Sequence, residues 1–217
     1  MAELNILFIG APGSGKGTQS FKLAQKKNLI HLSTGDLFRN NLKQETDLGL
    51  LAKSYIDKGQ LVPDSVTTDM VADFVKKISD KKGIVFDGFP RNLVQAKNFK
   101  KILSGNNRIL NQVIFFKISN QQVIARLTGR LYAQKSGLVY HVKNNPPKKK
   151  GVCDVSGETL ITRTDDNPEV IAERLDIFHK NTEALLNYYK KENLLKTIDA
   201  FYSPNEVFNS ILKALES

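Results

Sequence analysis

A glycine-rich turn between an apolar run and an amphipathic segment constrains this chain more than any other feature. The turn, Gly10-Ala-Pro-Gly-Ser-Gly-Lys-Gly-Thr18, follows the apolar run 4–9 and precedes a helical pattern over 16–27. Its glycines permit backbone angles that other residues resist, and they let main-chain N–H groups at the start of the helix approach an anion. A strand, such a turn and a helix in succession predict a phosphate-binding loop in an α/β fold.

Lys16 is the side chain of this turn that we expect to reach the phosphates. In a loop of this kind the lysine contacts the β- and γ-phosphates as a point charge. The hydroxyl residue that usually follows the lysine is replaced by Gly17, and a hydroxyl comes one position later, at Thr18. Gly17 has no group that binds Mg²⁺, so we expect Thr18 to contact phosphate, or the metal through water. The turn alone fits a kinase, an ATPase and a switch GTPase equally well.

Strand and helix patterns alternate along most of the chain, which predicts parallel βαβ units with helices on both faces of a sheet. Residues 131–164 break the alternation, because they contain glycine, proline and lysine but no long helical period. A long irregular stretch inside a compact domain is usually functional, often as a lid. Besides the strand over 4–9, we expect strands over 29–32, 83–87, 112–118 and 195–198. Besides the helix over 16–27, we expect helices in pieces over 33–59 and single helices over 64–79, 120–129 and 168–191, with a last helix after 203–206. Asp64 is the expected N-cap of the helix over 64–79, and Ser203–Glu206 is a capping box.

Composition indicates a globular chain of one domain. Its 217 residues suffice for a sizeable core, and 41% hydrophobic and 25% charged residues are ordinary values. No apolar run approaches about 18 residues, so we expect no membrane span. The start Met1–Asn5 lacks the basic region of a signal peptide. Cys153 is the only cysteine, so an internal disulfide is impossible. Together these features favour the cytoplasm.

The net charge of +10 raises the expectation of a polyanionic partner, whether nucleotide phosphate, nucleic acid or a membrane surface. Most of this charge is lysine, which a well-solvated surface explains. Arginine is rarer, and its planar fork suits bidentate binding of phosphate. Arg126 and Arg130 are four residues apart at the end of an expected helix, so they share a face; a bound anion would explain the pair, and so would two exposed solubilising side chains. The seven arginines are Arg39, Arg91, Arg108, Arg126, Arg130, Arg163 and Arg174.

Several arginines near strand ends, together with Lys16, suit phosphoryl transfer. The transition state of this reaction spreads negative charge over the transferred group, and a protein stabilises it by positioning and by charge. No Ser-His-Asp or Cys-His set is evident among the histidines, His31, His141 and His179. Asp87, which ends the expected strand 83–87, is a candidate to position a metal ion through water. A helix N-cap or a turn aspartate is the alternative.

With these motifs the chain resembles the adenylate kinase family over nearly its whole length. In this order and spacing the shared motifs are highly specific, whereas any one alone is moderate. They are Gly10–Thr18; Leu32-Ser-Thr-Gly-Asp36 with Arg39; Asp87-Gly-Phe-Pro-Arg91 with Gln95; Arg126-Leu-Thr-Gly-Arg130; Tyr140-His-Val; Asn145-Pro-Pro147; Thr162-Arg-Thr-Asp-Asp166; and Glu173-Arg174. The family resembles this chain at Gly17 also.

The resemblance implies a single α/β kinase domain over 1–217, with a P-loop parallel β-sheet flanked by helices. Its core is 1–32, 63–128 and 167–217, with a small helical AMP-binding segment at 33–62 and a mostly β lid at 129–166. It implies reversible phosphoryl transfer from Mg-ATP to AMP, giving two ADP, by in-line transfer with lid closure. It favours a monomer whose partners are ATP, AMP and ADP, with neither nucleic acid nor membrane bound.

The resemblance also implies site residues, position by position. Asp87 would support Mg²⁺ through water, and Arg108 is left as structural. The catalytic residues would be Lys16, Arg91, Arg130, Arg163 and Arg174. The ATP-binding residues would be Gly13, Ser14, Gly15, Lys16, Gly17, Thr18, Arg126, Arg130, Tyr140 and Ala200, with Arg126 and Ala200 near the base. The AMP-binding residues would be Thr34, Arg39, Gln60, Val62, Gly88, Arg91, Gln95, Arg163 and Arg174, with Thr34 and Gln95 reading adenine.

Three departures from the family pattern stand out. Asn92 follows Arg91 where Thr is usual, and Ala200 stands where Gly is common; we expect modest effects on affinity from both. In the lid, many relatives hold zinc with four Cys-type ligands. The four matching positions here are Ala133, Ser136, Cys153 and Ser156. A structural zinc site requires four N or S ligands, so we expect no zinc and a lid stabilised mainly by packing.

The sequence also has features that bear on three alternative functions. A kinase for UMP or CMP would share the fold, but the long lid and the pairing of Thr34 with Gln95 argue against it. A GTP-binding switch protein is disfavoured because the chain has no Asn-Lys-x-Asp motif. A basic nucleic-acid-binding module would interleave aromatic and basic residues on one face. Here the phenylalanines lie mostly in strands and core stripes.

Overall fold

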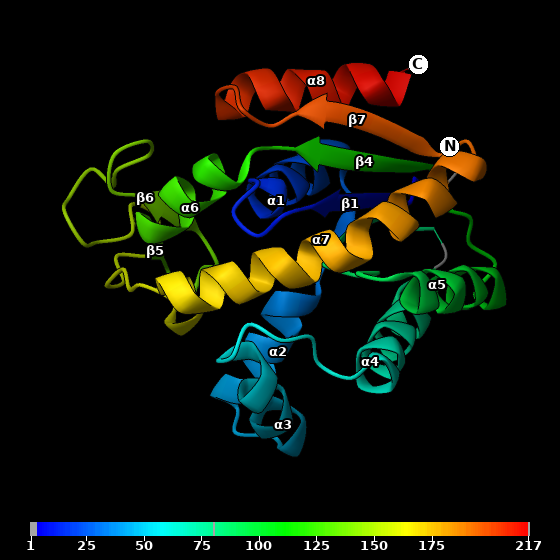
Figure 1. The fold of residues 1–217 in the computed structure, drawn as a ribbon, viewed down its shortest axis with the longest axis horizontal. Coiled ribbons are helices and arrows are strands. Elements are labelled where there is room, and N and C mark those ends of the chain that lie inside the picture. The colour runs from blue at the N-terminus through cyan, green and yellow to red at the C-terminus, as the bar shows by residue number, and fades with distance from the viewer. Residues whose placement is uncertain (1–3, 80, 217) are drawn as a thin grey trace.

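The computed structural model describes residues 4–79 and 81–216, and its centre is a five-stranded parallel sheet (Figure 1). Residues 1–3, 80 and 217, which the expected domain bounds include, lie outside the described residues. The strand order is β2-β3-β1-β4-β7, with every neighbouring pair parallel. The strands are β1 (Ile6–Gly10), β2 (Ile30–Ser33), β3 (Ile84–Asp87), β4 (Gln112–Lys117) and β7 (Leu195–Asp199).

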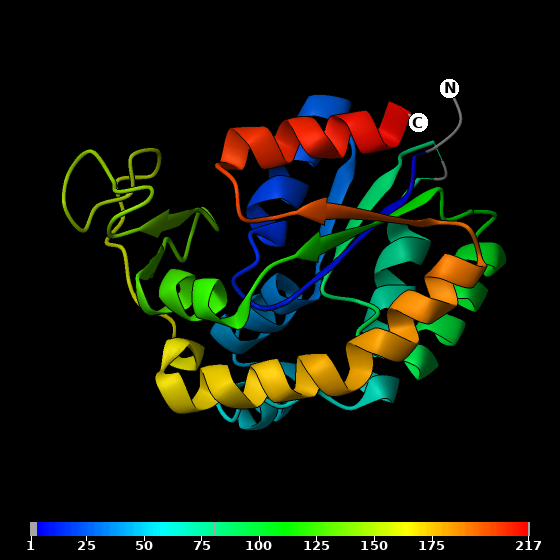
Figure 2. The same cartoon turned by 45° about the horizontal axis from the view of Figure 1, so that its top comes forward.

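Helices cover both faces of the sheet, as the alternation predicts (Figure 2). Neighbouring residues of β1 point to opposite faces: Leu7 and Ile9 pack with helices α4 (Asp64–Lys77), α5 (Leu93–Gly105) and α7 (Pro168–Lys191), whereas Ile6 and Phe8 pack with α1 (Lys16–Lys27) and α8 (Pro204–Glu216). This two-sided burial explains why β1 is a continuous apolar run rather than an alternating one.

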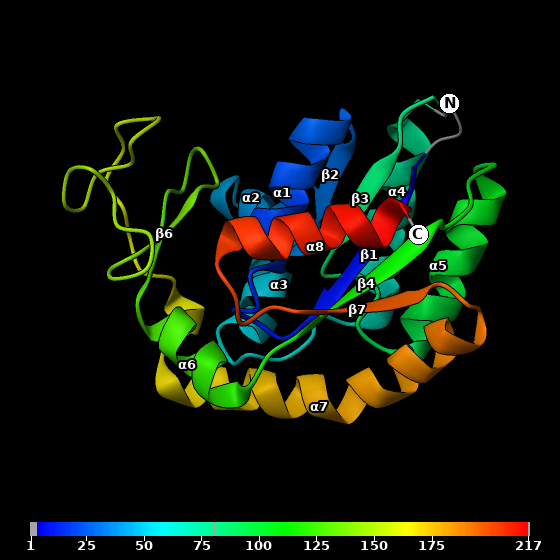
Figure 3. The same ribbon diagram turned by 90° about the horizontal axis from the view of Figure 1, so that it is seen from above.

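Two small units stand out from the parallel sheet and its covering helices, one at the bottom of Figure 1 and the other at the left of Figure 3. Helices α2 (Thr34–Lys43) and α3 (Asp47–Ile56) form one, and they have an apolar cluster of their own around Phe38, Ala52 and Val62. The other follows α6 (Asn120–Thr128) and contains the antiparallel pair β5 (Arg130–Tyr132) and β6 (Val139–His141). A single 3₁₀ turn, η1 (Thr164–Asp166), leads from it into α7.

The expected elements are confirmed to within one or two residues, and one expected cap is wrong. The capping box at Ser203 is present, with the Ser203 N–H donating to Glu206 at 3.0 Å. Asp64, however, is the first residue of α4 and not its N-cap; Pro63 takes that position without a side-chain bond. The Asp64 carboxylate instead accepts hydrogen bonds from Asn92 and Gln95. No helix among the described residues is long and apolar enough to cross a membrane.

Candidate functional site

The glycine-rich turn connects the buried end of β1 to the start of α1. Gly13 and Gly15 have φ of +74° and +92°, a region that side chains disfavour. A Cβ on Gly13 would also lie 2.8 Å from Leu127 Cγ, so α6 leaves no room for one. Gly15 caps α1 without a side-chain bond, which leaves the first N–H groups of the helix for an anion. This is the geometry expected of a phosphate-binding loop.

Lys16 and Asp87 meet at the base of this turn. The Lys16 ammonium donates to the Ala11 carbonyl at 3.3 Å. Desolvation lowers the pKa of Lys16 to about 8, with nearby arginines adding to the effect and Asp87 opposing it. A Cβ at position 17 would lie 3.2 Å from Asp87 Oδ2, so Gly17 keeps the space beside this carboxylate clear.

Asp87 is buried at the end of β3, opposite Phe8 of β1. Burial tends to raise its pKa, but His31 and Lys16 outweigh burial and hold the pKa of Asp87 below its usual range. His31 Nε2 lies 3.9 Å from Asp87 Oδ2 and 2.8 Å from the Ser20 hydroxyl. The helix that follows is capped by Asn92, so Asp87 is not an N-cap aspartate. It is an ionised carboxylate beside the phosphate-binding loop.

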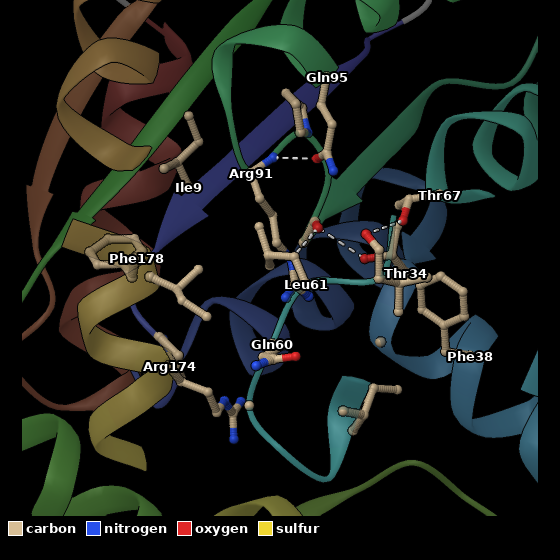
Figure 4. Close-up of a pocket in the computed structure, with 18 of the residues that line it drawn as sticks. Ile9, Thr34, Phe38, Gln60, Leu61, Thr67, Arg91, Gln95, Arg174 and Phe178 are labelled. Atoms are coloured by element: carbon tan, nitrogen blue, oxygen red, sulfur yellow. Dashed lines mark hydrogen bonds between the residues drawn. The ribbon is translucent and has the colours of Figure 1, made fainter. Parts of the chain in front are cut away.

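One pocket extends from Lys16 across the carboxyl edge of the sheet to α2 and α7 (Figure 4). Thr34 and Arg91 share the Gly88 carbonyl: the Thr34 hydroxyl donates to it at 2.9 Å, and Arg91 Nε donates to it at 2.7 Å. Gly88 has φ of +85°, and a Cβ there would lie 2.8 Å from the Thr34 hydroxyl oxygen. Of the nine residues that the resemblance assigns to AMP, eight line this pocket: Thr34, Arg39, Gln60, Val62, Gly88, Arg91, Gln95 and Arg174.

The ninth, Arg163, lies beside this pocket at the end of the lid segment. Its guanidinium stacks on the Tyr132 ring at 4.1 Å, and Arg39 lies 5.7 Å from the same ring. Desolvation, followed by the charges of Arg39 and Arg130, lowers the pKa of Arg163 to about 9. Desolvation, followed by Arg174, lowers the pKa of Arg91 to about 10. Burial is thus the main cause of both shifts, and repulsion between neighbouring arginines adds to it.

We call Lys16, Arg39, Arg91, Arg130, Arg163 and Arg174 the cationic cluster. Four carboxylates lie among its members: Asp36, Asp87, Asp165 and Asp166. Six cations against four carboxylates leave an excess of positive charge. The Nε atoms of Arg39 and Arg163 and the hydroxyl of Ser14 are buried and have no hydrogen-bond partner among the described residues. Buried polar groups are rarely left so, which indicates a polar, anionic ligand here.

Arg126 and Arg130 do not share a helix face, contrary to expectation. Helix α6 ends at Thr128, and Arg130 is the first residue of β5. Arg130 makes a bidentate ion pair with Asp166, with distances of 2.7 and 2.5 Å. Arg126 instead donates to the carbonyls of Ser14 at 3.1 Å and Ala200 at 2.7 Å. It thereby connects the phosphate-binding loop to the segment after β7.

The side chain of Tyr140, a residue expected to contact ATP, lies inside the lid. It is 7% exposed and packs inside the lid with Ala133, Cys153 and Leu160. Its hydroxyl lies 3.5 Å from Cys153 Sγ and accepts from the Asp154 N–H at 2.9 Å. The side chain therefore packs within the lid, and the expected contact of Tyr140 with ATP stays a prediction.

The four lid positions expected to match the zinc-ligand positions of relatives lie together around Cys153, with Ser156 hydrogen-bonded to the thiol. Cys153 Sγ lies 3.6 Å from the Ser136 hydroxyl, and Ala133 is buried beside it. Among the described residues, no three side chains of the His, Cys, Asp or Glu type gather as they would around a metal.

Glu158, which was not among the residues expected from the sequence, accepts from the N–H groups of Lys135 at 2.6 Å and Ser136 at 2.9 Å.

Arg108, left as structural, is buried and donates to the carbonyls of Lys82 at 2.7 Å and Ser79 at 2.6 Å. The aspartates Asp165 and Asp166 were missed as partners of the cationic cluster. Their position directly after Arg163-Thr was a usable signal, because adjacent carboxylates near several arginines suggest ion pairs.

Comparison with known proteins gives a consistent result. The family model described as adenylate kinase matches residues 8–194. An adenylate kinase from Caldanaerobacter subterraneus subsp. tengcongensis is 44% identical over 98% of this chain and 96% of its own length. One from Carboxydothermus hydrogenoformans is 45% identical over 98% of this chain and its full length, and one from Lachnospira eligens is 42% identical over the same shares.

A phosphate-binding loop faces a pocket rich in arginine, and the similarity to these relatives extends over nearly the whole chain. The chain therefore belongs to the adenylate kinase family, whose members transfer a phosphoryl group from ATP to AMP and form two ADP.

Proposed function

We propose that the phosphate-binding loop holds Mg-ATP, that the pocket lined by Thr34 and Gln95 holds AMP, and that the cationic cluster joins the two phosphate chains. The excess of cations over carboxylates in this cluster is the observation that carries the proposal. Two nucleotides brought end to end carry several negative charges into a small volume. A protein stabilises that arrangement with positioned cations.

On the ATP side, the loop residues Gly13–Thr18 would bind the phosphates through main-chain N–H groups and Lys16. Arg126 would lie against the base, with its guanidinium oriented by the carbonyls of Ser14 and Ala200. The Arg126 guanidinium is planar and suits stacking. Tyr140 stays in this set through its main chain, because its side chain is buried in the lid.

On the AMP side, Arg39 and Arg91 would bind the phosphate, and the main chain near Gln60 and Val62 would approach the base. Thr34 and Gln95 line the inner end of the pocket, where Arg91 N–H donates to Gln95 Oε1 at 2.7 Å (Figure 4). Gly88 provides the close approach that this end of the pocket requires, because its positive φ excludes larger residues.

The residues present fit a magnesium ion that arrives with ATP. Asp87 is ionised, and Gly17 leaves the space beside it open. Mg²⁺ is commonly held by one or two carboxylates, water and substrate phosphates. Asp87 would act through water, and Thr18 stands one residue beyond Gly17. When bound, Mg²⁺ neutralises charge on the β- and γ-phosphates.

In the proposed step, an oxygen of the AMP phosphate forms a bond to the γ-phosphorus of ATP, and the bond from that phosphorus to the β–γ bridging oxygen breaks. The electron pair of the broken bond stays on the leaving ADP. Lys16, Arg91, Arg130, Arg163 and Arg174 would stabilise the charge on the transferred group. The segment 33–62 and the lid 129–166 would close over the nucleotides and exclude water, which limits ATP hydrolysis.

The test offers Mg-ATP with AMP, CMP, UMP, GMP or no acceptor, and measures nucleoside diphosphate formation. We expect rapid ADP formation with AMP alone. Arg91→Ala should lower kcat by at least about 100-fold without a change in melting temperature, because a charge-stabilising donor is lost. Lys97→Ala, an exposed cation on the next helix, is the matched control. A near-normal kcat for Arg91→Ala refutes its role, and transfer to CMP or UMP refutes the base assignment.

A monomeric state, a cytoplasmic location and the absence of a nucleic-acid partner are further proposals. The single cysteine of the chain supports a reducing compartment. Sedimentation analysis tests the monomeric state, and a binding assay with DNA at physiological salt tests the absence of a nucleic-acid partner.

A further inference from the structure

Asp64, at the first turn of α4, holds a set of hydrogen bonds that the proposed reaction does not use. Its carboxylate accepts from Asn92 Nδ2 at 3.0 and 3.1 Å and from Gln95 Nε2 at 2.7 Å. Helices α4 and α5 are thus joined at their N-terminal ends, directly behind the pocket that Gln95 lines.

These bonds permit only one orientation of the Gln95 amide. Its oxygen faces the main-chain N–H of Arg91 at 2.7 Å, and its nitrogen faces Asp64 at 2.7 Å. An N–H group only donates, and an ionised carboxylate only accepts. Turning the amide by 180° would place two donors face to face and two acceptors face to face. Gln95 is 1% exposed, so no bulk water would compensate the two lost bonds.

Asn92 is held in the same way. Its oxygen caps α5 by accepting from the Gln95 N–H at 2.8 Å, so its nitrogen must face Asp64. One side chain thereby caps the helix and stabilises the carboxylate that orients Gln95. Asn92, at a position where Thr was expected, therefore takes part in both the cap and the contact with Asp64.

The orientation matters because an amide side chain that turns by 180° can form two hydrogen bonds with either of two purine edges. It offers one acceptor beside one donor. Adenine presents an amino donor beside the N1 acceptor, whereas a 6-oxopurine such as hypoxanthine presents an oxygen acceptor beside an N1–H donor. A freely turning amide matches either edge, and a locked amide matches only one. Gln95 retains one N–H and one oxygen lone pair beyond the bonds to Asp64 and Arg91, which is the pair that such an edge requires.

We propose that Asp64 is a specificity-determining positioning residue, which locks the Gln95 amide in the orientation complementary to adenine and thereby rejects 6-oxopurine nucleotides. The proposal rests on the proposed function, because it requires Gln95 to contact the base of the acceptor nucleotide. Asp64 acts through Gln95 and does not touch the substrate.

The test compares kcat/KM for AMP and for IMP in the wild type and in Asp64→Asn. The new amide can turn either a donor or an acceptor toward Gln95, so of the two bonds that fix the Gln95 amide only the one from the Arg91 N–H still selects an orientation. We expect the AMP-to-IMP ratio to fall by about 10- to 100-fold, the range that a bidentate base contact discriminates. The KM for ATP should stay unchanged. Asp69→Asn, an exposed carboxylate on the same helix, is the matched control and should keep the wild-type ratio.

Gln95→Ala separates failure of the inference from failure of the base contact. In that background, Asp64→Asn should change the ratio no further. If Asp64→Asn leaves the ratio within about twofold of wild type while Gln95→Ala lowers it, the lock is refuted and the base contact stands. If Gln95→Ala itself leaves the ratio unchanged, the base contact fails, and the inference fails with it. Melting temperature reports any loss of folding in each variant.

Discussion

Removal of the Asp166 carboxylate offers the sharpest test of the site, because the ion pair of Asp166 with Arg130 joins the two ends of the lid. Both oxygens of Asp166 accept from Arg130, and the two side chains are only 4% and 12% exposed. Loss of one partner of a buried ion pair leaves an uncompensated charge and costs about 3–5 kcal/mol. We take the lower end, about 3 kcal/mol, for Asp166→Ala because Asp165, which also interacts electrostatically with Arg130, remains.

The expected change in melting temperature follows from the length of the chain. Unfolding entropy is about 2.1 cal/mol/K per residue, or about 0.46 kcal/mol/K for 217 residues. A loss of about 3 kcal/mol therefore lowers the melting temperature by about 6–7 °C, measured by calorimetry. The value of kcat should fall as well, since Arg130 loses the partner that orients it.

A double variant separates stability from catalysis. Replacement of a buried ion pair by apolar residues of similar size is often neutral for stability. Arg130→Met with Asp166→Leu should therefore melt within about 2–3 °C of wild type and still lack activity. If Asp166→Ala alone melts within that interval, the pair contributes little and the reasoning about its burial is wrong. If the double variant is active, Arg130 has no part in catalysis.

Three further outcomes are expected. Lys16 is charged below its pKa of about 8 and neutral above it, so ATP affinity should weaken as the pH rises through 8. Calorimetry from pH 7 to about 9.5 measures this affinity. The variant Lys16→Arg, which stays charged, should show no such loss. Arg126→Ala should raise the KM for ATP severalfold and leave the KM for AMP unchanged in steady-state kinetics, because its carbonyl partners lie beside the loop and the segment after β7. Glu158→Gln should speed hydrogen exchange at the Lys135 and Ser136 amides, because both donate to the Glu158 carboxylate. In the wild type this protection should persist in acid, because hydrogen bonds lower the pKa of Glu158 to about 2. Equal exchange in the two proteins would contradict this.

Local sequence signals were sufficient for the phosphate-binding loop and for most of the elements, although helix α5 was not among those expected. Helix α7 was predicted over Pro168–Lys191 and has those bounds, because a proline in the first turn and an apolar stripe are local features. The loop follows from glycine conformations at Gly13 and Gly15, which nearest neighbours determine. Asp64 failed as a predicted cap because partners about 30 residues away along the chain outweighed its local preference.

The sequence by itself therefore determined the parallel α/β fold, the phosphate-binding loop and most of the side chains that meet in one pocket. Only the tertiary structure decided how those side chains are paired: Arg130 with Asp166, 36 residues apart, Arg126 with Ala200, 74 residues apart, and Tyr140 inside the lid. The reason is physical. Backbone conformation depends on neighbours in the chain, whereas the partner of a buried charge or hydroxyl depends on which segments the sheet and helices bring together.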